Sequence, residues 1–553
     1  MEQTEQTNDQ WLWFVDNELV EALARTDFLE AASEKRPVQS STLAKVLALN
    51  MDGKTEQALR EIRDAIDGGE DLPELAWTKA HLEFQLGHFE NALEDYQKVL
   101  ETQPRHKAAT FNAALCLEKL KRYEEAVAAF HKAAGLDPKL AEATLGAGIC
   151  ELHCNRPESA LAAFEECLNA QPDNSRAQYG RAVTLHLLGR TEEAADCYNQ
   201  LLPNNSSDAE LVTNMIRLAL ARGEHDKARE YSDKLLRLRP NAQAGLTGMI
   251  AAAMARGDYK SAAQLGAQLV KTASSSFEAW FNLGVAYQKT NRLEQAGQAY
   301  AEALKLKPDN ALAYANLGAA LQERGDQPEA RKAYERALQL APENPSALWN
   351  LAIVQDRLGN SSETEKCIEK LVEVDPERED AWFRLGYLRL LRGDSAGSIE
   401  PLRVCVSKRP DWFEALMNLG VAQRRSGDLD AAKASFTQAV ATHPRSTDAL
   451  RALAAVAVDR GDYVLALDTE AKLEQLGERI PELNYNIGVL LQQSNLQEDA
   501  ARTYRRATEE KPDFAEALLN LGHALEALGQ EEEARACWQQ AMLVKPELAE
   551  KYF

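Results

Sequence analysis

The chain has 553 residues and a net charge of −23 at pH 7. This charge, together with the lack of a basic stripe, excludes a nucleic-acid partner, because phosphate binding needs concentrated Lys and Arg. No apolar run approaches the ~20 residues that span a bilayer, which excludes membrane insertion. An acidic chain either favours basic partners or is simply kept soluble, and composition does not separate these two interpretations.

The first 38 residues differ in character from the rest. Residues 1–10 are polar and predict a disordered tail. They carry no positive charge ahead of the apolar stretch, so they are not a secretory signal. The segment WLWFVDNELVEALA at 11–24 predicts an amphipathic helix, which either caps the following domain or docks on a partner or a second copy of the chain. We therefore expect a cytoplasmic protein.

A 34-residue period begins at residue 73 and continues without insertion or deletion. Position 8 of each segment is Gly or Ala in 12 of 14, position 20 is Ala in 12 of 14, and position 32 is Pro in 11 of 14. Position 24 is mostly large and aromatic. The segments start at 73, 107, 141, 175, 209, 243, 277, 311, 345, 379, 413, 447, 481 and 515.

The period predicts two helices per segment, at about positions 1–14 and 15–28. Small residues at positions 8 and 20 let the two helices approach closely, and the large residue at position 24 fills the space before the next pair. Proline at position 32 stops the second helix. Such a hairpin cannot bury its apolar face alone and must stack on its neighbours.

This pattern resembles the tetratricopeptide repeat (TPR) family, and AWFNLGVAYQKTNRLEQAGQAYAEALKLKPDN at 279–310 is a close match. The resemblance covers 73–548 clearly and 39–72 weakly, through Ala58 at position 20 and Ile62 at position 24. It implies an all-α, right-handed superhelical solenoid of about 14–15 hairpins. It further implies that positions 2, 5, 6, 9, 12 and 13 of the first helices line a concave groove.

The array divides into four regular repeats at 73–208, two degenerate repeats at 209–276 and eight regular repeats at 277–548. The degenerate pair has Ile at position 8 and Ser or Gly at position 24. We predict that 203–276 is the softest section, and the alternative is intact stacking of degenerate repeats. Residues 549–553 begin a further helix that does not complete, which leaves an apolar edge for a partner or for self-association unless the last residues fold over it.

The eight cysteines predict free buried thiols, because seven of them fall at helix-packing positions. Cys150 and Cys154 lie on one helix with His153 between them, and His186 follows in the next repeat. No CxxC spacing supports a metal site there, so we predict neither metal nor cofactor.

Asparagine recurs at position 6, although it is a poor residue for the middle of a helix. A side-chain amide offers both a donor and an acceptor and can bracket the backbone of an extended polypeptide. The alternative is that these amides cap or bridge neighbouring helices. The residues are Asn112, Asn214, Asn282, Asn316, Asn350, Asn418, Asn486 and Asn520.

This ladder looks like that in the TPR superhelix of O-linked N-acetylglucosamine transferase. The catalytic domain that follows the repeats there is absent from this sequence, so the resemblance implies polypeptide binding without glycosyl transfer.

Position 5 is often aromatic and adds apolar surface beside the amides, as at Phe281, Trp349 and Phe383. Arg384 occupies position 6 between two asparagines and either holds a ligand carboxylate or pairs with a nearby acid, Asp380 or Asp356. The lysines of the chaperone-tail carboxylate clamp known from some TPR domains are not matched here.

The sequence contains no Gly-rich phosphate loop, HExxH or GxSxG motif, so we predict that the protein is not an enzyme. The pattern favours a scaffold or adaptor that binds an extended or disordered segment of a protein partner in its groove. One alternative is a dedicated assembly factor or chaperone that holds one enzyme or complex. Another is a structural protein that forms homo-oligomers through its termini.

Overall fold

The computed structural model describes residues 41–70, 73–203 and 207–547, and these ranges form 30 α-helices and no β-strand. The helices divide between two compact units, 1–290 and 291–553. The boundary falls inside the predicted eight-repeat array rather than in the degenerate pair. The predicted tail, the helix at 11–24 and the end at 549–553 lie outside the described residues.

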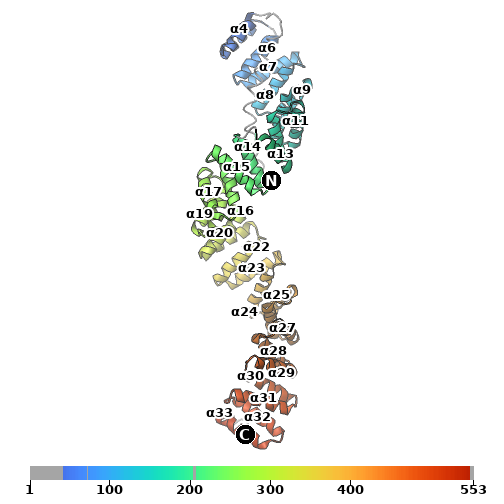
Figure 1. The fold of residues 1–553 in the computed structure, drawn as a ribbon, viewed down its shortest axis with the longest axis vertical. Coiled ribbons are helices and arrows are strands. Elements are labelled where there is room, and N and C mark those ends of the chain that lie inside the picture. The colour runs from blue at the N-terminus through green and yellow to red at the C-terminus, as the bar shows by residue number, and fades with distance from the viewer. Residues whose placement is uncertain (1–40, 71–72, 204–206, 548–553) are drawn as a thin grey trace. The chain divides into compact units, whose positions relative to one another are not determined.

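The first unit holds helices α4 to α18, which run in sequence order (Figure 1). Helices α4 to α17 form successive pairs, and α18 follows them. They are α4 (Ser41–Met51), α5 (Thr55–Asp67), α6 (Pro73–Gln85), α7 (Phe89–Thr102), α8 (Lys107–Lys119), α9 (Tyr123–Leu136), α10 (Ala141–His153), α11 (Pro157–Ala170), α12 (Ser175–Leu187), α13 (Thr191–Leu201), α14 (Ala209–Ala221), α15 (His225–Leu238), α16 (Gln243–Ala255), α17 (Tyr259–Thr272) and α18 (Phe277–Lys289).

The second unit holds helices α19 to α33. They are α19 (Leu293–Leu306), α20 (Ala311–Arg324), α21 (Gln327–Leu340), α22 (Pro345–Arg357), α23 (Ser361–Val374), α24 (Glu379–Leu391), α25 (Ser395–Lys408), α26 (Phe413–Arg425), α27 (Leu429–Thr442), α28 (Thr447–Asp459), α29 (Tyr463–Gln475), α30 (Pro481–Gln493), α31 (Gln497–Glu510), α32 (Ala515–Ala527) and α33 (Glu531–Val544).

The two helices of a repeat occupy positions 1–13 and 17–30, as in α26 and α27, so the second helix starts and ends two residues later than predicted. The cause is the turn between them, where position 15 has a positive φ in all fourteen repeats. Glycine adopts this conformation without strain and fills the position in ten repeats. The other four residues are Lys121, Asn155, Asn291 and Asn495. The weak repeat at 39–72 also forms a helix pair, with Ile62 buried.

The side chain at position 24 joins each repeat to the next. Phe164 is fully buried, and a methyl group added at Gly148, position 8 of the same repeat, would lie 2.8 Å from its ring. A methyl group at Gly180, position 6 of the following repeat, would lie 2.6 Å from the same ring. The ring therefore fills the space between successive hairpins, as the period predicts, and the glycines create the room for it.

In the degenerate repeats the large residue stands at position 8 and the small residue at position 24, the reverse of the regular repeats. Ile216 at position 8 and Ser232 at position 24 are both buried, and both lie against Gly248 of the next repeat. In the second repeat, Ile250 takes position 8 and Gly266 takes position 24, where a Cβ would meet Leu283 at 3.1 Å. These contacts agree with the alternative of intact stacking. That 203–276 is the softest section remains a prediction.

Acidic residues at position 2 have structural partners in several repeats. The carboxylates lie in the first turn of a helix, where they favour its positive end. In three repeats the carboxylate also pairs with a cation at position 31 of the same repeat, one residue before the recurring proline. The pairs are Glu210 with Arg239 (2.9 Å), Glu482 with Lys511 (3.0 Å) and Glu516 with Lys545 (2.7 Å).

We predict that Gly420→Ala destabilises the second unit by about 1–3 kcal/mol, because the new methyl group would lie 2.6 Å from the buried ring of Phe436. Urea unfolding followed by circular dichroism measures the change. Gly297→Ala is the matched control, since its methyl group would meet only Leu317 at 3.9 Å. The control should be neutral or stabilising by up to about 1 kcal/mol. Equal effects of both variants would contradict the packing described here.

We also predict an acid-sensitive first unit. Burial lowers the pKa of His81, in α6, to about 4. An unfolded histidine has a pKa of ~6.5, so the folded state binds fewer protons between these values and loses stability as the pH falls from about 6.5 to 4. The loss from this group is at most about 3 kcal/mol. His81→Gln should flatten the dependence of the urea midpoint on pH in this window, and an unchanged dependence would contradict the prediction.

Candidate polypeptide-binding groove

The eight asparagines of the ladder all lie at the sixth position of a first helix. Their exposure differs: Asn112 and Asn214 are buried, Asn486 is exposed, and the other five are intermediate. The helices that carry them are α8, α14, α18, α20, α22, α26, α30 and α32.

Five of these amides interact with tyrosine hydroxyls, three of them through hydrogen bonds. Burial raises the pKa of Tyr300 and of Tyr334, and the side-chain amides of Asn316 and Asn350, respectively, act against this rise. In the other three cases Nδ2 of the asparagine donates to a phenol oxygen. The pairs are Asn112 with Tyr96 (3.1 Å), Asn214 with Tyr179 (2.5 Å), and Asn520 with Tyr485 (3.4 Å) and Tyr504 (3.5 Å).

The tyrosine hydroxyl is held on its other side as well. Tyr334 Oη donates to Gln322 Oε1 at 2.9 Å, and Tyr504 Oη donates to Gln492 Oε1 at 2.9 Å. Both glutamines occupy position 12 of the tyrosine's own repeat. The hydroxyl of Tyr504 also accepts from Asn520 Nδ2 of the following repeat, so this chain of bonds bridges two hairpins. Such bridging is the structural alternative for the ladder.

A sequence rule accompanies this geometry. Each of the five repeats with Tyr at position 24 is followed by Asn at position 6 of the next repeat. Each of the three repeats with Phe there is followed by Gly or Ala, because the ring leaves no amide partner and little room. The tyrosine pairs are Tyr96–Asn112, Tyr198–Asn214, Tyr300–Asn316, Tyr334–Asn350 and Tyr504–Asn520, of which Asn214 bonds instead with Tyr179.

Three asparagines fall outside this rule. Asn282, Asn418 and Asn486 follow Gly266, Leu402 and Glu470, respectively, at position 24. Within the described ranges, none of the three makes a side-chain hydrogen bond, and all three are at least partly exposed. Packing between repeats does not account for their presence in the middle of a helix.

The aromatic row at position 5 is accessible in the second unit. Trp349 and Phe383 are half-buried. The guanidinium of Arg378 lies 4.4 Å from the ring centroid of Trp349, and Phe383 stacks on Trp412 with the centroids 4.7 Å apart. In the first unit, Phe281 is also half-buried and stacks on Phe277 at 5.6 Å. These rings offer apolar faces beside the amides.

Arg384 is paired within the protein. Its Nη2 lies 2.6 Å from Oδ2 of Asp356, one of the two acids expected for it, while the other, Asp380, pairs with Arg378. Arg384 therefore carries its own counter-ion at the groove position between Asn350 and Asn418.

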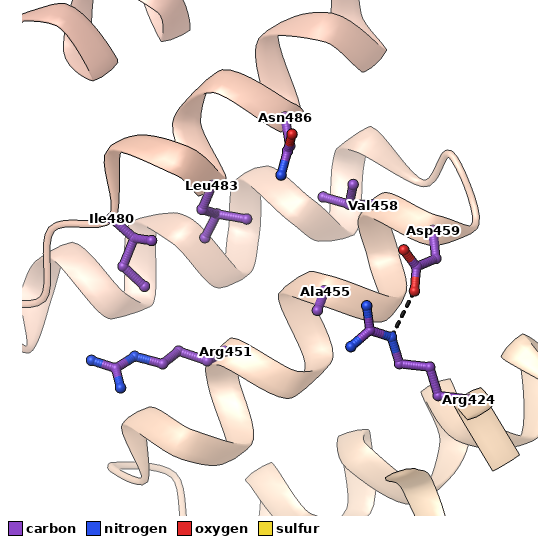
Figure 2. A pocket seen from close by; sticks show the side chains of 8 residues that line it. All are labelled: Arg424, Arg451, Ala455, Val458, Asp459, Ile480, Leu483 and Asn486. Carbon is purple, nitrogen blue, oxygen red and sulfur yellow. Dashed lines mark hydrogen bonds and ion pairs between the residues drawn. The ribbon is translucent and has the colours of Figure 1, made fainter. Parts of the chain in front are cut away.

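A cavity of about 380 Å³ lies over three successive first helices, α26, α28 and α30 (Figure 2). Six of its eight lining residues occupy positions 5, 6, 9, 12 or 13 of these three helices. One wall is apolar and the opposite wall carries two arginines, while the amide of Asn486 borders the hollow. The lining residues are Arg424, Arg451, Ala455, Val458, Asp459, Ile480, Leu483 and Asn486.

The two arginines were missed by the sequence analysis. Arg451 is the only charged residue at position 5 in the fourteen repeats, and this departure from the aromatic row was the available signal. Arg424 Nε donates to Asp459 Oδ2 at 2.6 Å, and Arg451 pairs with Glu478. Nothing in the spacing alone shows that Arg424, Arg451 and Asn486 border one cavity.

All eight cysteines are free, as predicted; five are buried, and Cys154, Cys367 and Cys537 are half-buried. Burial raises the pKa of Cys367 to about 11 and that of Cys405 to about 12, so both thiols are neutral at pH 7 and poor nucleophiles. His153, between Cys150 and Cys154, stacks on Tyr123 with the ring centroids 4.1 Å apart. In the described part of the chain, no three His, Cys, Asp or Glu side chains are grouped to hold a metal ion.

Of the helices in the described ranges, none combines the length and apolarity that crossing a membrane requires.

Tetratricopeptide repeat models match the chain along most of its length. One of them matches more than half of the chain by itself, so the chain belongs to the tetratricopeptide repeat family. Its members are typically non-catalytic scaffolds that bind other proteins, and a protein-interaction scaffold is the general class that these repeats define. The matched residues are 78–141, 154–209, 213–276, 417–479 and 485–547 for that model, and 275–343 and 321–385 for two others.

Solved structures with similar repeats are distant. MamA from Desulfovibrio magneticus RS-1 is 23% identical and covers 31% of this chain and 97% of its own, with a TM-score of 0.30. YrrB, described as a TPR protein with an unusual peptide-binding site, is 22% identical and covers 34% and 98%, with a TM-score of 0.31. A chain of the Cut9–Hcn1 hetero-tetramer of the APC/C is 13% identical and covers 84% and 98%, with a TM-score of 0.33. No curated protein matches the chain.

We predict that the Tyr96–Asn112 bond contributes to stability and not only to orientation. Asn112→Ala should destabilise the first unit by about 1–3 kcal/mol, because the amide is buried and hydrogen-bonded. In a double-mutant cycle with Tyr96→Phe, the coupling energy should be about 0.5–1.5 kcal/mol. Asn418→Ala, which removes no such bond, should change stability by less than about 0.5 kcal/mol. A coupling energy near zero would show that the bond does not bridge the repeats.

Proposed function

We propose that this protein is a non-catalytic scaffold or adaptor that binds an extended segment of another protein along the groove of its first helices. The observation that carries the proposal is the set of three ladder amides, Asn282, Asn418 and Asn486, that lack an internal hydrogen-bond partner in the described residues and are at least partly exposed.

The chemistry of the amide fits this role. Asparagine has two N–H donors and a carbonyl acceptor, which match the C=O and N–H groups of an extended backbone whatever its side chains are. An asparagine in the middle of a helix lowers the stability of that helix. A tyrosine partner offsets this cost at five of the eight positions, and a bound backbone would do so at the remaining three.

The tyrosine-bonded amides can also take part. The interaction of Asn316 with Tyr300, or of Asn350 with Tyr334, engages one group of the amide. At least two hydrogen-bonding groups of the amide stay available, because the amide carries three such groups. Asn112 and Asn214 are buried, so their role is structural in this proposal.

Apolar surface beside the amides would supply the area of contact. The half-buried rings of Trp349 and Phe383 occupy position 5 of their helices, next to the ladder position. Asn486 borders a hollow with one aliphatic wall. Binding sites for proteins combine such aromatic and aliphatic surface with polar groups that set orientation.

A selection of random peptides displayed against the full chain tests the proposal. Selected peptides should bind the wild type, and Asn418→Ala/Asn486→Ala should weaken this binding by about tenfold. The reason is that two lost hydrogen bonds of ~0.5–1.5 kcal/mol each amount to one or two tenfold steps in the dissociation constant. Fluorescence anisotropy with the selected peptides measures the effect.

Asn91→Ala/Asn169→Ala provides the matched control, since both residues are exposed and lie on second helices, α7 and α11. The control should bind the peptides as the wild type does. Peptides that bind the wild type and the Asn418→Ala/Asn486→Ala variant equally well would place binding outside the groove and refute the role of the amides.

A further inference from the structure

The hollow over α26, α28 and α30 indicates the chemistry of the segment that it would bind. This inference rests on the proposed function and deepens it. We infer that the hollow takes an acidic residue of an extended polypeptide, with a large aliphatic residue of the same segment next to it, and that the carboxylate binds to Arg424 and Arg451.

The hydrogen-bonding groups around the hollow are mainly donors. Arg424 has five N–H donors and uses only Nε for Asp459 Oδ2, so its two terminal nitrogens stay available. In Figure 2 these nitrogens lie on the side of Ala455, away from Asp459. Asn486 adds the N–H groups of its amide. A carboxylate is the group that best satisfies such a set, because a guanidinium can bind it with two parallel bonds.

The arginines already have acidic neighbours, but these pairs are easily exchanged. Arg451 pairs with Glu478, and Asp448 Oδ1 lies 3.8 Å from its Nη1. The side chain of Arg451 is 47% exposed and that of Glu478 is 33% exposed. Ion pairs that are this open to solvent are screened and contribute little to stability. A carboxylate of the bound segment can therefore replace Glu478 at little cost.

The charge of the hollow differs from that of the chain as a whole. Its lining holds two arginines and one aspartate, whereas the protein carries a net charge of −23. Arg425 follows Arg424 at position 13 of α26, is exposed, and makes no ion pair within the described ranges. Two arginines at one hollow of an acidic chain favour one acidic residue at this point over a uniformly acidic segment, which the acids around them would repel.

The opposite wall fits an aliphatic side chain. Val458, Ile480 and Leu483 face the hollow from α28 and from the start of α30 (Figure 2). Leu483 is buried, whereas Val458 and Ile480 are intermediate and leave apolar surface open to water. Burying one leucine-sized side chain there removes apolar surface of both partners from water. Because side chains of an extended strand alternate, an acidic and an aliphatic residue two positions apart would lie on the same face of the segment.

Three fluorescein-labelled peptides test this inference on the full chain. They share their leucines and their amidated C-terminus, so that only side-chain carboxylates are present, and they differ by having Glu, Gln or Lys at the same positions. The Glu peptide should bind at least about tenfold more tightly than the Lys peptide, because the bonds to the guanidinium are charge-assisted. This preference should shrink as salt is added, since the site is open to solvent.

Arg424→Gln/Arg451→Gln should abolish the preference for Glu. Arg424→Lys/Arg451→Lys should retain only part of this preference, because lysine keeps the positive charge but cannot form the bidentate bond of a guanidinium. Arg403→Gln/Arg535→Gln is the matched control, with the same change in net charge at exposed arginines on α25 and α33. The control should keep the full preference, and circular dichroism confirms that each variant is folded.

The outcomes separate this inference from the proposed function. If the three peptides bind equally and Asn418→Ala/Asn486→Ala weakens all of them, the groove binds polypeptide but the acidic preference is refuted. If none of the three peptides binds, or if the preference for Glu survives Arg424→Gln/Arg451→Gln, the inference is overturned, whatever peptides the groove selects. Loss of the preference in the arginine variants alone supports it.

Discussion

The fit of the position-24 side chain between two hairpins is the interaction on which the rest of this structure depends. Phe164 and the other phenylalanines and tyrosines at this position are almost fully buried between their own repeat and the next. A hairpin alone would expose this side chain, so the burial that stabilises the protein exists only between neighbours. The same contact sets the spacing of the first helices and thereby the spacing of the groove positions that they carry.

This packing also determines which amides are available to a ligand. Position 6 belongs both to the joint between repeats and to the groove. Where the joint holds a tyrosine, as at Tyr96, the amide of Asn112 bridges the two repeats. Where position 24 holds Leu402 or Glu470, the amides of Asn418 and Asn486 have no such bond in the described residues. In the proposed function, stability and recognition therefore share one row of residues and divide it repeat by repeat.

The charged residues also divide between a structural role and the proposed role in binding. Many acidic residues lie in the first turns of helices, where they stabilise the positive helix end and pair with cations of the same repeat, as Glu482 does with Lys511. A large negative charge therefore reflects the repeated architecture and does not by itself identify a partner. The distribution of the few groove arginines carries more information, and Arg424 and Arg451 border the same hollow.

The sequence by itself determined the helix pairs, their 34-residue repeat, the family and the role of position 24, because these follow from local periodicity and from residue size. It also indicated the pairing of Arg384 with an acid. Position 15 of the turn was missed, although its ten glycines are visible, because the two helices were expected to follow each other directly. Only the tertiary structure decided which ladder asparagines are bonded, since each bond joins a groove residue to a tyrosine of the preceding repeat. It alone brought Arg424, Arg451 and Asn486 to one hollow, because they come from three helices whose side chains meet only when the hairpins stack.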